Sequence, residues 1–393
     1  MKLKPSFGEE PPNKYYESDI RHTLQMCQWL LKPIGMWSPI YGSASINEKI
    51  ISLILIVASF CFLGFVFFPA SHYIFFLESD VNARLVMFGP VGFTFTAAVK
   101  YCYLGLKSST FGRCIRHVES DWRMIDDPVR RNIMLRNVAI GRHLTIICVL
   151  FLYVGGLSYH VALPLLSKKT VGNVTSRTLM YQGYDIFFDA TASPTYEILF
   201  VFHCLFALTV YNITSASCNL AAVFVTHACG QIQIQMQRLD SLVQLHKTQS
   251  PYGEDPLTSI VKDHIRVLRY RDIVTGMLIL LILRFVNEWR DHNPKGFTSY
   301  FLFLISLTFN IFIMCYIGEL LIEKTCGIGE TCCTLEWYRL PLETARGLIL
   351  IMGISSNPVT ITAGKMVDLS ISTFGNVLKT SVAYYSFLRT TIL

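Results

Sequence analysis

Long apolar runs alternate with polar connections along almost the whole of this sequence. A run of about 20 apolar residues is long enough to cross a bilayer as a helix. By this measure we expect seven membrane spans, at residues 50–69, 85–106, 144–166, 196–225, 273–289, 297–322 and 365–388. The fifth span is the weakest, because Arg284 lies inside it and its apolar part is short.

The end of the chain departs from this pattern. An apolar stretch over residues 347–354 breaks where Pro358 removes a backbone donor and biases Asn357 away from helix. A helical pattern resumes at about Lys365, but polar and charged side chains such as Asn376 and Lys379 interrupt it. Lipid penalises such side chains unless they face protein or water. We therefore expect the final span to line a path or an interface.

The composition is that of a membrane protein. Of the 393 residues, 52% are hydrophobic and 16% are charged, whereas an ordinary soluble domain carries about 25% charged residues. Most of the mass lies in the predicted spans, so we expect one integral-membrane domain. Residues 1–47 are polar and contain prolines, without a charged cap and apolar run, so no cleavable signal peptide is expected.

The placement of Lys and Arg predicts the orientation. The N-terminal segment and the second, fourth and sixth connections carry 23 of these residues, whereas the opposite connections carry 6. Because cytoplasmic loops are enriched in Lys and Arg, the N-terminus is expected in the cytoplasm and, with seven spans, the C-terminus outside. This topology places the glycosylation sequon at Asn173 outside the cell, while the sequon at Asn212 falls within the fourth span.

The cytoplasmic connection after the fourth span is expected to be helical. Ile232, Met236, Leu239 and Val243 form an apolar stripe after the fourth span, and a second amphipathic stretch begins at Leu257. Such a bundle could join subunits or could cap a monomer. None of the 12 cysteines lies in an outer connection, and none has the spacing of zinc ligands. Buried apolar thiols are therefore expected, with no disulfide framework, metal or cofactor.

The C-terminal region carries a combination of motifs. They are Cys333 with Trp337 and Tyr338, Leu340-Pro341, Asn357-Pro358, Thr362-Ala363-Gly364-Lys365, Phe374, and the terminal Ser381, Tyr384, Tyr385, Ser386 and Leu388. Together these motifs resemble insect odorant receptors, and the length and span count are similar to that family. The connection between the fourth and fifth spans lacks the long insertion of the family's shared co-receptor, which favours a ligand-tuning subunit.

The resemblance implies an all-α membrane protein of seven transmembrane helices, with a cytosolic anchor domain and a last helix in two parts. The implied function is an odorant-gated, non-selective cation channel that is a heterotetramer with a co-receptor, in the plasma membrane of sensory neurons. Its partners would be a small volatile organic ligand and the lipid bilayer, and no nucleic acid. The implied divisions are 1–230 for the ligand-binding part, 231–272 for anchor helices, 273–320 for two spans, 321–356 for the remaining anchor, and 357–393 for the pore-lining helix.

Helical spacing places five residues of the last span near one face, where Tyr384 is an alternative to Ala383. They are Thr380, Ala383, Phe387, Thr390 and Thr391. The resemblance aligns Phe387 with a hydrophobic gate, and a bulky apolar ring of side chains can close a pore by excluding water. The alternative is that Phe387 packs against a neighbouring span. The directions of Lys379 and Arg389 stay open.

The resemblance also implies a ligand pocket in the outer halves of the second, third, fourth and sixth spans. A volatile ligand needs a buried, mostly apolar site. The residues there are Met87, Phe88, Val91, Phe95, Tyr153, Gly156, Leu157, His160, Tyr196, Phe200, His203, Tyr300, Phe303 and Leu304. Gly155 and Gly156 would leave room beside a helix. Ordinary helix packing, and hydrogen bonds between spans for the two histidines, are the alternatives.

Other classes fit the sequence less well. A G-protein-coupled receptor needs an outside N-terminus, and a secondary transporter usually has internal repeats. An insect gustatory receptor shares the expected architecture, but the terminal Ser381 and Tyr384 motif favours the odorant family. An enzyme is not expected, because no nucleophile with a partnered base stands out. Asp121, Asp126 and Asp127 are interpreted as a solvated acidic face.

Overall fold

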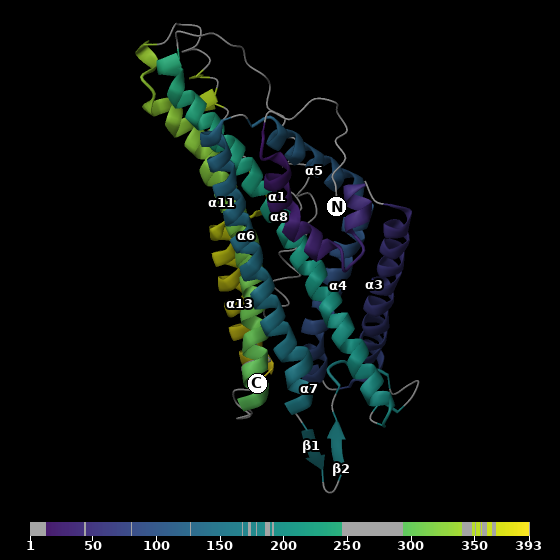
Figure 1. The fold of residues 1–393 in the computed structure, drawn as a ribbon. Coiled ribbons are helices and arrows are strands. Elements are labelled where there is room, and N and C mark those ends of the chain that lie inside the picture. Colours follow the sequence, from purple (N-terminus) through teal and green to yellow (C-terminus); the bar gives the residue numbers. More distant parts are fainter. Residues whose placement is uncertain are drawn as a thin grey trace.

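Long helices that pack side by side form the molecule (Figure 1). The computed structural model describes residues 13–42, 45–79, 81–125, 127–166, 168–171, 174–177, 179–184, 189–190, 192–245, 294–339, 348–349, 351–353, 355, 360–363 and 367–392. Four helical stretches within these residues are long and apolar enough to cross a membrane. They are Ile46–Leu77, Pro128–Ala162, Thr195–Gln237 and Phe301–Thr334.

The first four predicted spans and the sixth are helical, and the last, α13 (Ile371–Ile392), is described below. The first four and the sixth correspond to α3 (Ile46–His72), α4 (Val81–Leu106), α6 (Pro128–Leu157) with its continuation, α8 (Thr195–Leu245) and α11 (Pro294–Thr334). Three of these helices are much longer than the predicted spans, because their amphipathic extensions continue beyond the apolar runs. The predicted span at 273–289, with Arg284, lies outside the described residues, as does the stretch that begins at Leu257.

Helix α8 is the centre of the packing. It contacts α1 (Tyr16–Leu31), α3, α4, α6 and α11, and the α6–α8 and α8–α11 contacts are the most extensive. Its middle is buried on almost every side, from Val210 to Gly230. A helix that is hydrophobic all round is expected at such a central position.

Two helices that the sequence reading did not predict cover one end of the bundle. In α1 the buried stripe is Ile20, Leu24, Cys27 and Leu31, and in α5 (Ser108–Arg123) it is Phe111, Ile115, Val118 and Trp122. Both stripes follow the helical period. The buried carboxylate of Asp19 accepts two hydrogen bonds from Arg131, both of 2.7 Å, which ties α1 to α6.

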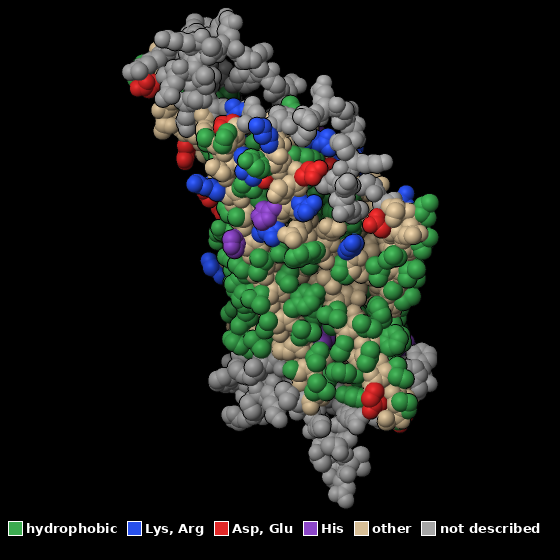
Figure 2. Space-filling view, in the orientation of Figure 1, with side chains coloured by type: hydrophobic (Ala, Val, Ile, Leu, Met, Phe, Trp, Pro, Cys, Tyr) green, Lys and Arg blue, Asp and Glu red, His purple; other side chains and the backbone are tan. Residues whose placement is uncertain are grey.

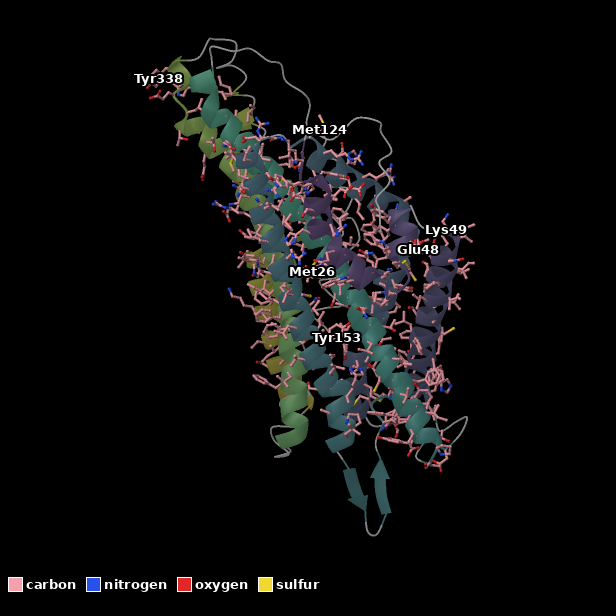
Figure 3. All side chains as sticks on the ribbon, viewed as in Figure 1. Met26, Glu48, Lys49, Met124, Tyr153 and Tyr338 are labelled. Carbon is pink, nitrogen blue, oxygen red and sulfur yellow. The ribbon has the colours of Figure 1, made fainter. Side chains whose placement is uncertain are left out.

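Lys and Arg side chains gather at the end of the molecule that α1 and α5 cover, and apolar side chains cover the middle (Figure 2). We call this end the basic end. Glu48 and Lys49, at the start of α3, and Met124, which follows α5, lie toward it, whereas Tyr153 lies farther along the bundle (Figure 3). The basic end lies on one side of the apolar middle of the molecule. The Lys and Arg residues are thus concentrated at one end, as their distribution along the sequence predicts.

The opposite end carries a small antiparallel hairpin of β1 (Lys168–Val171) and β2 (Val174–Arg177), in which Thr170 pairs with Thr175 (Figure 1). We call this the hairpin end. The hairpin follows α7 (Leu163–Leu166). Asn173 lies outside the described residues, so the structure does not describe the predicted glycosylation site.

The extensions of α8 and α11 pack together near the basic end. Leu239, Cys332, Leu335 and Leu348 form a separate apolar cluster, with Ile351 and Met352 beside it. Leu239 belongs to the stripe that predicted a helix beyond the fourth span. The stretch before the Pro358 break therefore packs against the extended helices.

The last helix begins later than predicted. Residues 362–363 and 367–368 form the antiparallel strands β3 (Thr362–Ala363) and β4 (Val367–Asp368), and α13 runs over Ile371–Ile392. The side chain of Ser370 caps the helix by accepting from the Thr373 amide at 3.2 Å, and the Glu319 carboxylate accepts from the Ile371 amide at 3.0 Å. The predicted start at Lys365 was wrong because these contacts set the helix N-terminus at residue 371.

The acidic residues of the second connection are not simply a solvated face. The Asp121 carboxylate lies 2.8 Å from Nε2 of the buried His227 on α8, and Asp127 caps α6 by accepting from the Val129 amide at 2.9 Å. Asp126 lies outside the described residues. Asp121 therefore joins α5 to α8, which the sequence interpretation missed.

Candidate functional site

His160 lies at the centre of a buried polar contact between helices near the hairpin end. It belongs to the π-helical turn η2 (Ser158–Ala162) that follows α6. Its Nε2 lies 3.1 Å from the Tyr181 hydroxyl, and its Nδ1 lies 2.5 Å from the Tyr211 hydroxyl and 3.2 Å from the Gly156 carbonyl oxygen. A neutral imidazole satisfies both tyrosines, since one ring nitrogen donates and the other accepts.

His203 forms a second such contact on α8. Its Nε2 lies 3.1 Å from the Tyr184 hydroxyl, which in turn donates to the Phe65 carbonyl oxygen of α3 at 3.3 Å. The Tyr184 hydroxyl therefore accepts from His203 while it donates to Phe65. The rings of Tyr181 and His203 meet at 5.5 Å, so the two contacts adjoin. We call His160, His203, Tyr181, Tyr184 and Tyr211 the histidine–tyrosine cluster.

The cluster is almost completely removed from solvent. The exposed fraction of each of its five residues is 3% or less. A charged imidazole would be expensive in such surroundings, whereas a neutral and hydrogen-bonded one is not. The cluster can therefore offer hydrogen bonds to a neutral polar group, in surroundings that are otherwise aromatic.

Aromatic rings form the wall beside His160. The Phe303 ring of α11 stacks on Tyr159 with centroids 4.7 Å apart and meets the Phe93 ring of α4 edge-on at 6.0 Å. Phe206 lies 5.5 Å from Tyr181, also edge-on. Such rings bury large apolar areas and prefer these edge-on or stacked arrangements. The site is therefore assembled from α4, α6 with η2, α8, α11 and the segment 179–184.

The two glycines of α6 do not leave empty space in this structure. A side chain at Gly156 would overlap the Tyr211 ring, and one at Gly155 would overlap Ser306 and the backbone of Leu302 on α11. The expected room beside the helix is thus taken by Tyr211 and by the close approach of α11. The glycines are needed for helix packing, and they let the Tyr211 hydroxyl reach His160.

The structure brings several predicted ligand residues together and leaves others apart. His160, Gly156, Tyr153, Phe303 and His203 lie at the cluster, where the Tyr153 and Tyr211 rings are 5.7 Å apart. The remaining buried or partly buried members pack elsewhere in the core of the bundle or lie at the start of α8. They are Met87, Phe88, Val91, Tyr196, Phe200 and Leu304.

Phe95 and Leu157 do not join the cluster. Their exposed fractions are 45% and 37%, and the Phe95 ring packs on Phe67 of α3 at 6.1 Å. Both residues lie on the face of their helix that is turned away from the core, because successive positions of a helix point in different directions. Tyr300 lies on α11, and its side chain lies outside the described residues.

Sequence reasoning missed three tyrosines of the cluster. Tyr211 follows His203 by eight residues, two turns along the same face of α8, and this spacing could have revealed it. Tyr181 and Tyr184 come from a connection without regular periodicity, so no local pattern indicated that they fold back among the helices.

The predicted pore residues all lie on α13, which packs against α11 (Figure 1). Val377 and Ser381 are buried, and the Phe374 ring meets the Phe312 ring of α11 at 5.3 Å. Thr380 and Ala383 are exposed, and so is Lys379. The side chains of Phe387, Thr390, Thr391, Tyr384 and Arg389 lie outside the described residues.

The outward face of α13 is unusually polar for a helix beside lipid. Its exposed side chains include Ser372, Asn376, Lys379, Thr380 and Ser386. Ile371 and Val382 are the exposed large apolar residues on this helix among those described. Hydrocarbon would penalise this polar face, so it is suited to contact water or another protein surface.

Comparison with known protein families agrees with this architecture. The family described as 7tm odorant receptor matches residues 80–284 and 273–382, which is more than half of the chain. The chain belongs to the 7tm odorant receptor family. This confirms the predicted family in preference to the gustatory alternative, and it is a family of receptors rather than a class of enzymes.

Individual relatives of this odorant receptor are distant. Odorant receptor 85b of Drosophila melanogaster is 24% identical over 201 residues, covering 47% of this chain and 52% of that protein. Odorant receptor 67a of the same fly is 26% identical, covering 38% and 40%. Odorant receptor Or2 of Anopheles gambiae is 24% identical, covering 51% and 58%. The chain thus spans about half the length of the relatives it matches.

A solved structure matches over almost the whole length. The insect olfactory receptor OR5 of Machilis hrabei, in complex with eugenol, superposes with a TM-score of 0.70 at 13% identity. The match covers 96% of this chain and 100% of that one, and the ligand-free receptor gives the same TM-score. At this identity the likeness shows the fold, a predominantly helical insect olfactory receptor fold of a multi-pass membrane protein.

Proposed function

We propose that this chain is the ligand-tuning subunit of an odorant-gated, non-selective cation channel, completed as a heterotetramer by a co-receptor. The observation that carries the proposal is the polar, exposed face of α13. Its described side chains are exposed in a single subunit, and a bilayer would make this exposure costly. Sister subunits around a water-filled path provide the surroundings that such a helix needs.

The proposed orientation puts the basic end in the cytoplasm of a sensory neuron. Support comes from the Lys and Arg side chains at that end, from the apolar belt below them, and from the rule that cytoplasmic loops are basic (Figure 2). Helix α13 ends toward the hairpin end (Figure 1), so the C-terminus would lie outside. The hairpin would then carry the glycosylation site at Asn173 on the outer side of the plasma membrane.

We propose that the ligand is a small, mostly apolar volatile compound that binds at the histidine–tyrosine cluster. The aromatic wall supplies apolar contact, and the two Tyr–His contacts can exchange a hydrogen bond with a carbonyl or hydroxyl group. A ligand that displaces Tyr211 or Tyr181 from His160 would occupy the volume that these rings now fill. Eugenol, bound by the receptor of Machilis hrabei, has this chemical character.

Gating follows from the ligand's preference for one arrangement of the helices. A ligand shifts an equilibrium only by its differential affinity for the two states. Helix α11 links the site to the pore helix, because Phe303 lies at the cluster and Phe312 contacts Phe374 of α13. Phe387 would form the closed gate, with Thr380, Ala383, Thr390 and Thr391 along the path. The anchor would hold subunits together through residues 231–272 and 321–356.

The deciding experiment is expression of the chain with and without a co-receptor, with recording of membrane current against a broad panel of volatile compounds. The proposal expects an inward cation current that needs both subunits and an odorant. In the same cells, Phe88→Ala and Tyr300→Ala should shift the concentration–response curve without changing the single-channel conductance. A G-protein-dependent response without inward current would contradict the channel function.

A further inference from the structure

The lipid-facing side of α3 is hollowed. A groove of about 770 Å³ lies along the helix between Val57 and Pro69, in the half nearer the hairpin end. Its lining includes the rings of Phe60, Phe65 and Phe68, together with Cys61 and Gly64. Phe68 is 71% exposed and Val57 is 55% exposed, so the groove faces the surroundings of the bundle. Its volume is within the range of small-molecule sites.

Tyr184 lines this groove and is also a member of the histidine–tyrosine cluster. Its ring lies 5.3 Å from the Phe65 ring, and its hydroxyl bridges the Phe65 carbonyl and His203 Nε2. From His203 the contacts continue through Tyr181 to His160. The Tyr184 side chain therefore contacts both the membrane-facing groove and the proposed ligand site.

We propose that apolar ligands reach the histidine–tyrosine cluster from the bilayer, through the α3 groove, when the Tyr184 side chain moves aside. The inference rests on the proposed function and adds the route by which the ligand arrives. The occupant is the small, apolar volatile ligand itself. Such a compound concentrates in hydrocarbon because apolar surface leaves water favourably, and the groove is lined by hydrocarbon and aromatic groups.

The construction of the Tyr184 contact suits a movable side chain. Its contacts include two hydrogen bonds and ring packing, and a ligand hydroxyl could replace both hydrogen bonds, because it can accept from His203 Nε2 and donate to the Phe65 carbonyl oxygen. Segment 179–184 comes from a connection and not from a membrane helix, so its tyrosines can move without displacing a span. The Phe65 and His203 rings lie on either side of the Tyr184 ring, at 5.3 Å and 5.5 Å, and would contact a passing ligand.

The test fills the groove without touching the cluster. Gly64→Leu places a side chain in its lining, where the nearest group is the exposed ring of Phe68, 3.3 Å from a built Cβ. The matched control is Gly105→Leu, on an exposed position of α4, where the nearest atom is 3.6 Å away and no groove wall is involved. Both variants exchange a helical glycine for the same side chain, so their effects on the helix are alike.

Activation and washout of the odorant current would be recorded under rapid solution exchange, with the co-receptor present. For Gly64→Leu the proposal expects the activation rate and the washout rate to fall by about tenfold, because the added side chain raises the barrier to passage of the ligand. The half-maximal concentration should not change. Gly105→Leu should behave as the wild type. Unchanged rates in Gly64→Leu overturn the route. A shifted half-maximal concentration at unchanged rates also overturns it, because the groove would then be a binding site for ligand or lipid.

A second measurement uses the native thiol, so it does not depend on folding of a variant. Octyl methanethiosulfonate forms a mixed disulfide with Cys61, releases methanesulfinate and leaves an alkyl chain in the groove. The wild type should then respond more slowly, with reversal by dithiothreitol, and Cys61→Ser should be insensitive. An unaffected response in fully labelled protein would overturn the route. If the untreated channel gives no odorant current at all, the proposed function fails and not the route alone.

Discussion

Helices α3 and α13 both lie at the outside of the bundle, yet their outward faces have opposite chemistry. On α3 the exposed side chains are large and apolar, among them Ile51, Leu53 and Ile54, each more than half exposed. On α13 they include Asn376, Lys379 and Thr380. Two faces that are both exposed in a single subunit therefore need different surroundings. One face is suited to lipid, and the other must be covered by water or by another subunit.

The difference also separates what a subunit does alone from what it does in an assembly. The apolar face of α3 is complete once a bilayer surrounds it, and the histidine–tyrosine cluster is buried within the same chain. A bilayer does not provide favourable surroundings for the polar face of α13. In the proposed channel, ligand recognition can thus belong to one subunit, whereas conduction would require several.

The largest effect is expected from placing the same charge on the two faces. Ile54→Lys puts an ammonium group on the lipid side of α3, where insertion costs up to about 2.5–3.5 kcal/mol, the value for a charge at the centre of a span. Thr380→Lys adds the charge where water is expected. Surface biotinylation should show a severe loss of Ile54→Lys and near-normal delivery of Thr380→Lys. Equal delivery of both would remove the distinction between the faces.

A slightly smaller effect is expected when an aromatic ring is truncated on each helix. Phe387→Ala removes the proposed gate. If the gate buries this ring in the closed state only, its loss removes about 1.5–3 kcal/mol and should favour the open state by at least about tenfold. Current without odorant should rise. Phe68→Ala, at a position that is 71% exposed on α3, should leave that baseline unchanged. If both variants raise it, or neither does, Phe387 is not the gate.

The site between the two helices should respond to loss of its central imidazole. His160→Leu leaves the Tyr181 and Tyr211 hydroxyls without their shared partner, at about 1–3 kcal/mol for each buried polar group. The concentration–response curve should shift by about tenfold or more, with normal single-channel conductance. Phe95→Leu, on the exposed side of α4, is the control and should give the wild-type curve. A conductance change in His160→Leu would place this residue in the pore instead.

The smallest effect concerns the positive charge on α13. Lys379 is exposed beside Thr380, and at about 10 Å in water a unit charge repels a passing cation by about 0.4 kcal/mol. Lys379→Gln should therefore raise the inward cation conductance by up to about twofold, more at low salt than at high salt. Single-channel recording in two ionic strengths would measure it. The same conductance at low salt would show that Lys379 faces away from the path.

The fold was largely accessible from the sequence, because long apolar runs determine membrane helices almost by themselves. The stripes of α1 and α5, such as Ile20, Leu24, Cys27 and Leu31, were equally regular but lay in segments without a long apolar run. The start of α13 could not be read from hydrophobicity, because Ser370 and Glu319 determine it through hydrogen bonds.

The site was only partly accessible. His160 and His203 stand out as polar residues within apolar spans, and such residues are marked by their cost in lipid. Their partners Tyr181 and Tyr184 lie in a connection, and only the folded chain brings them to the histidines. Gly156 was recognised as a place where something approaches the helix, but the sequence could not say that Tyr211 does so.

The most direct test of the account is the water accessibility of the two outward faces. Thr380→Cys, Ala383→Cys and Ile54→Cys would each be co-expressed with the co-receptor and exposed to a charged, membrane-impermeant methanethiosulfonate during odorant application, with the wild type as the control for its native thiols. The account predicts that current through Thr380→Cys and Ala383→Cys is progressively blocked, while Ile54→Cys and the wild type are unaffected. Protection of both α13 positions, with modification at Ile54→Cys, would contradict it.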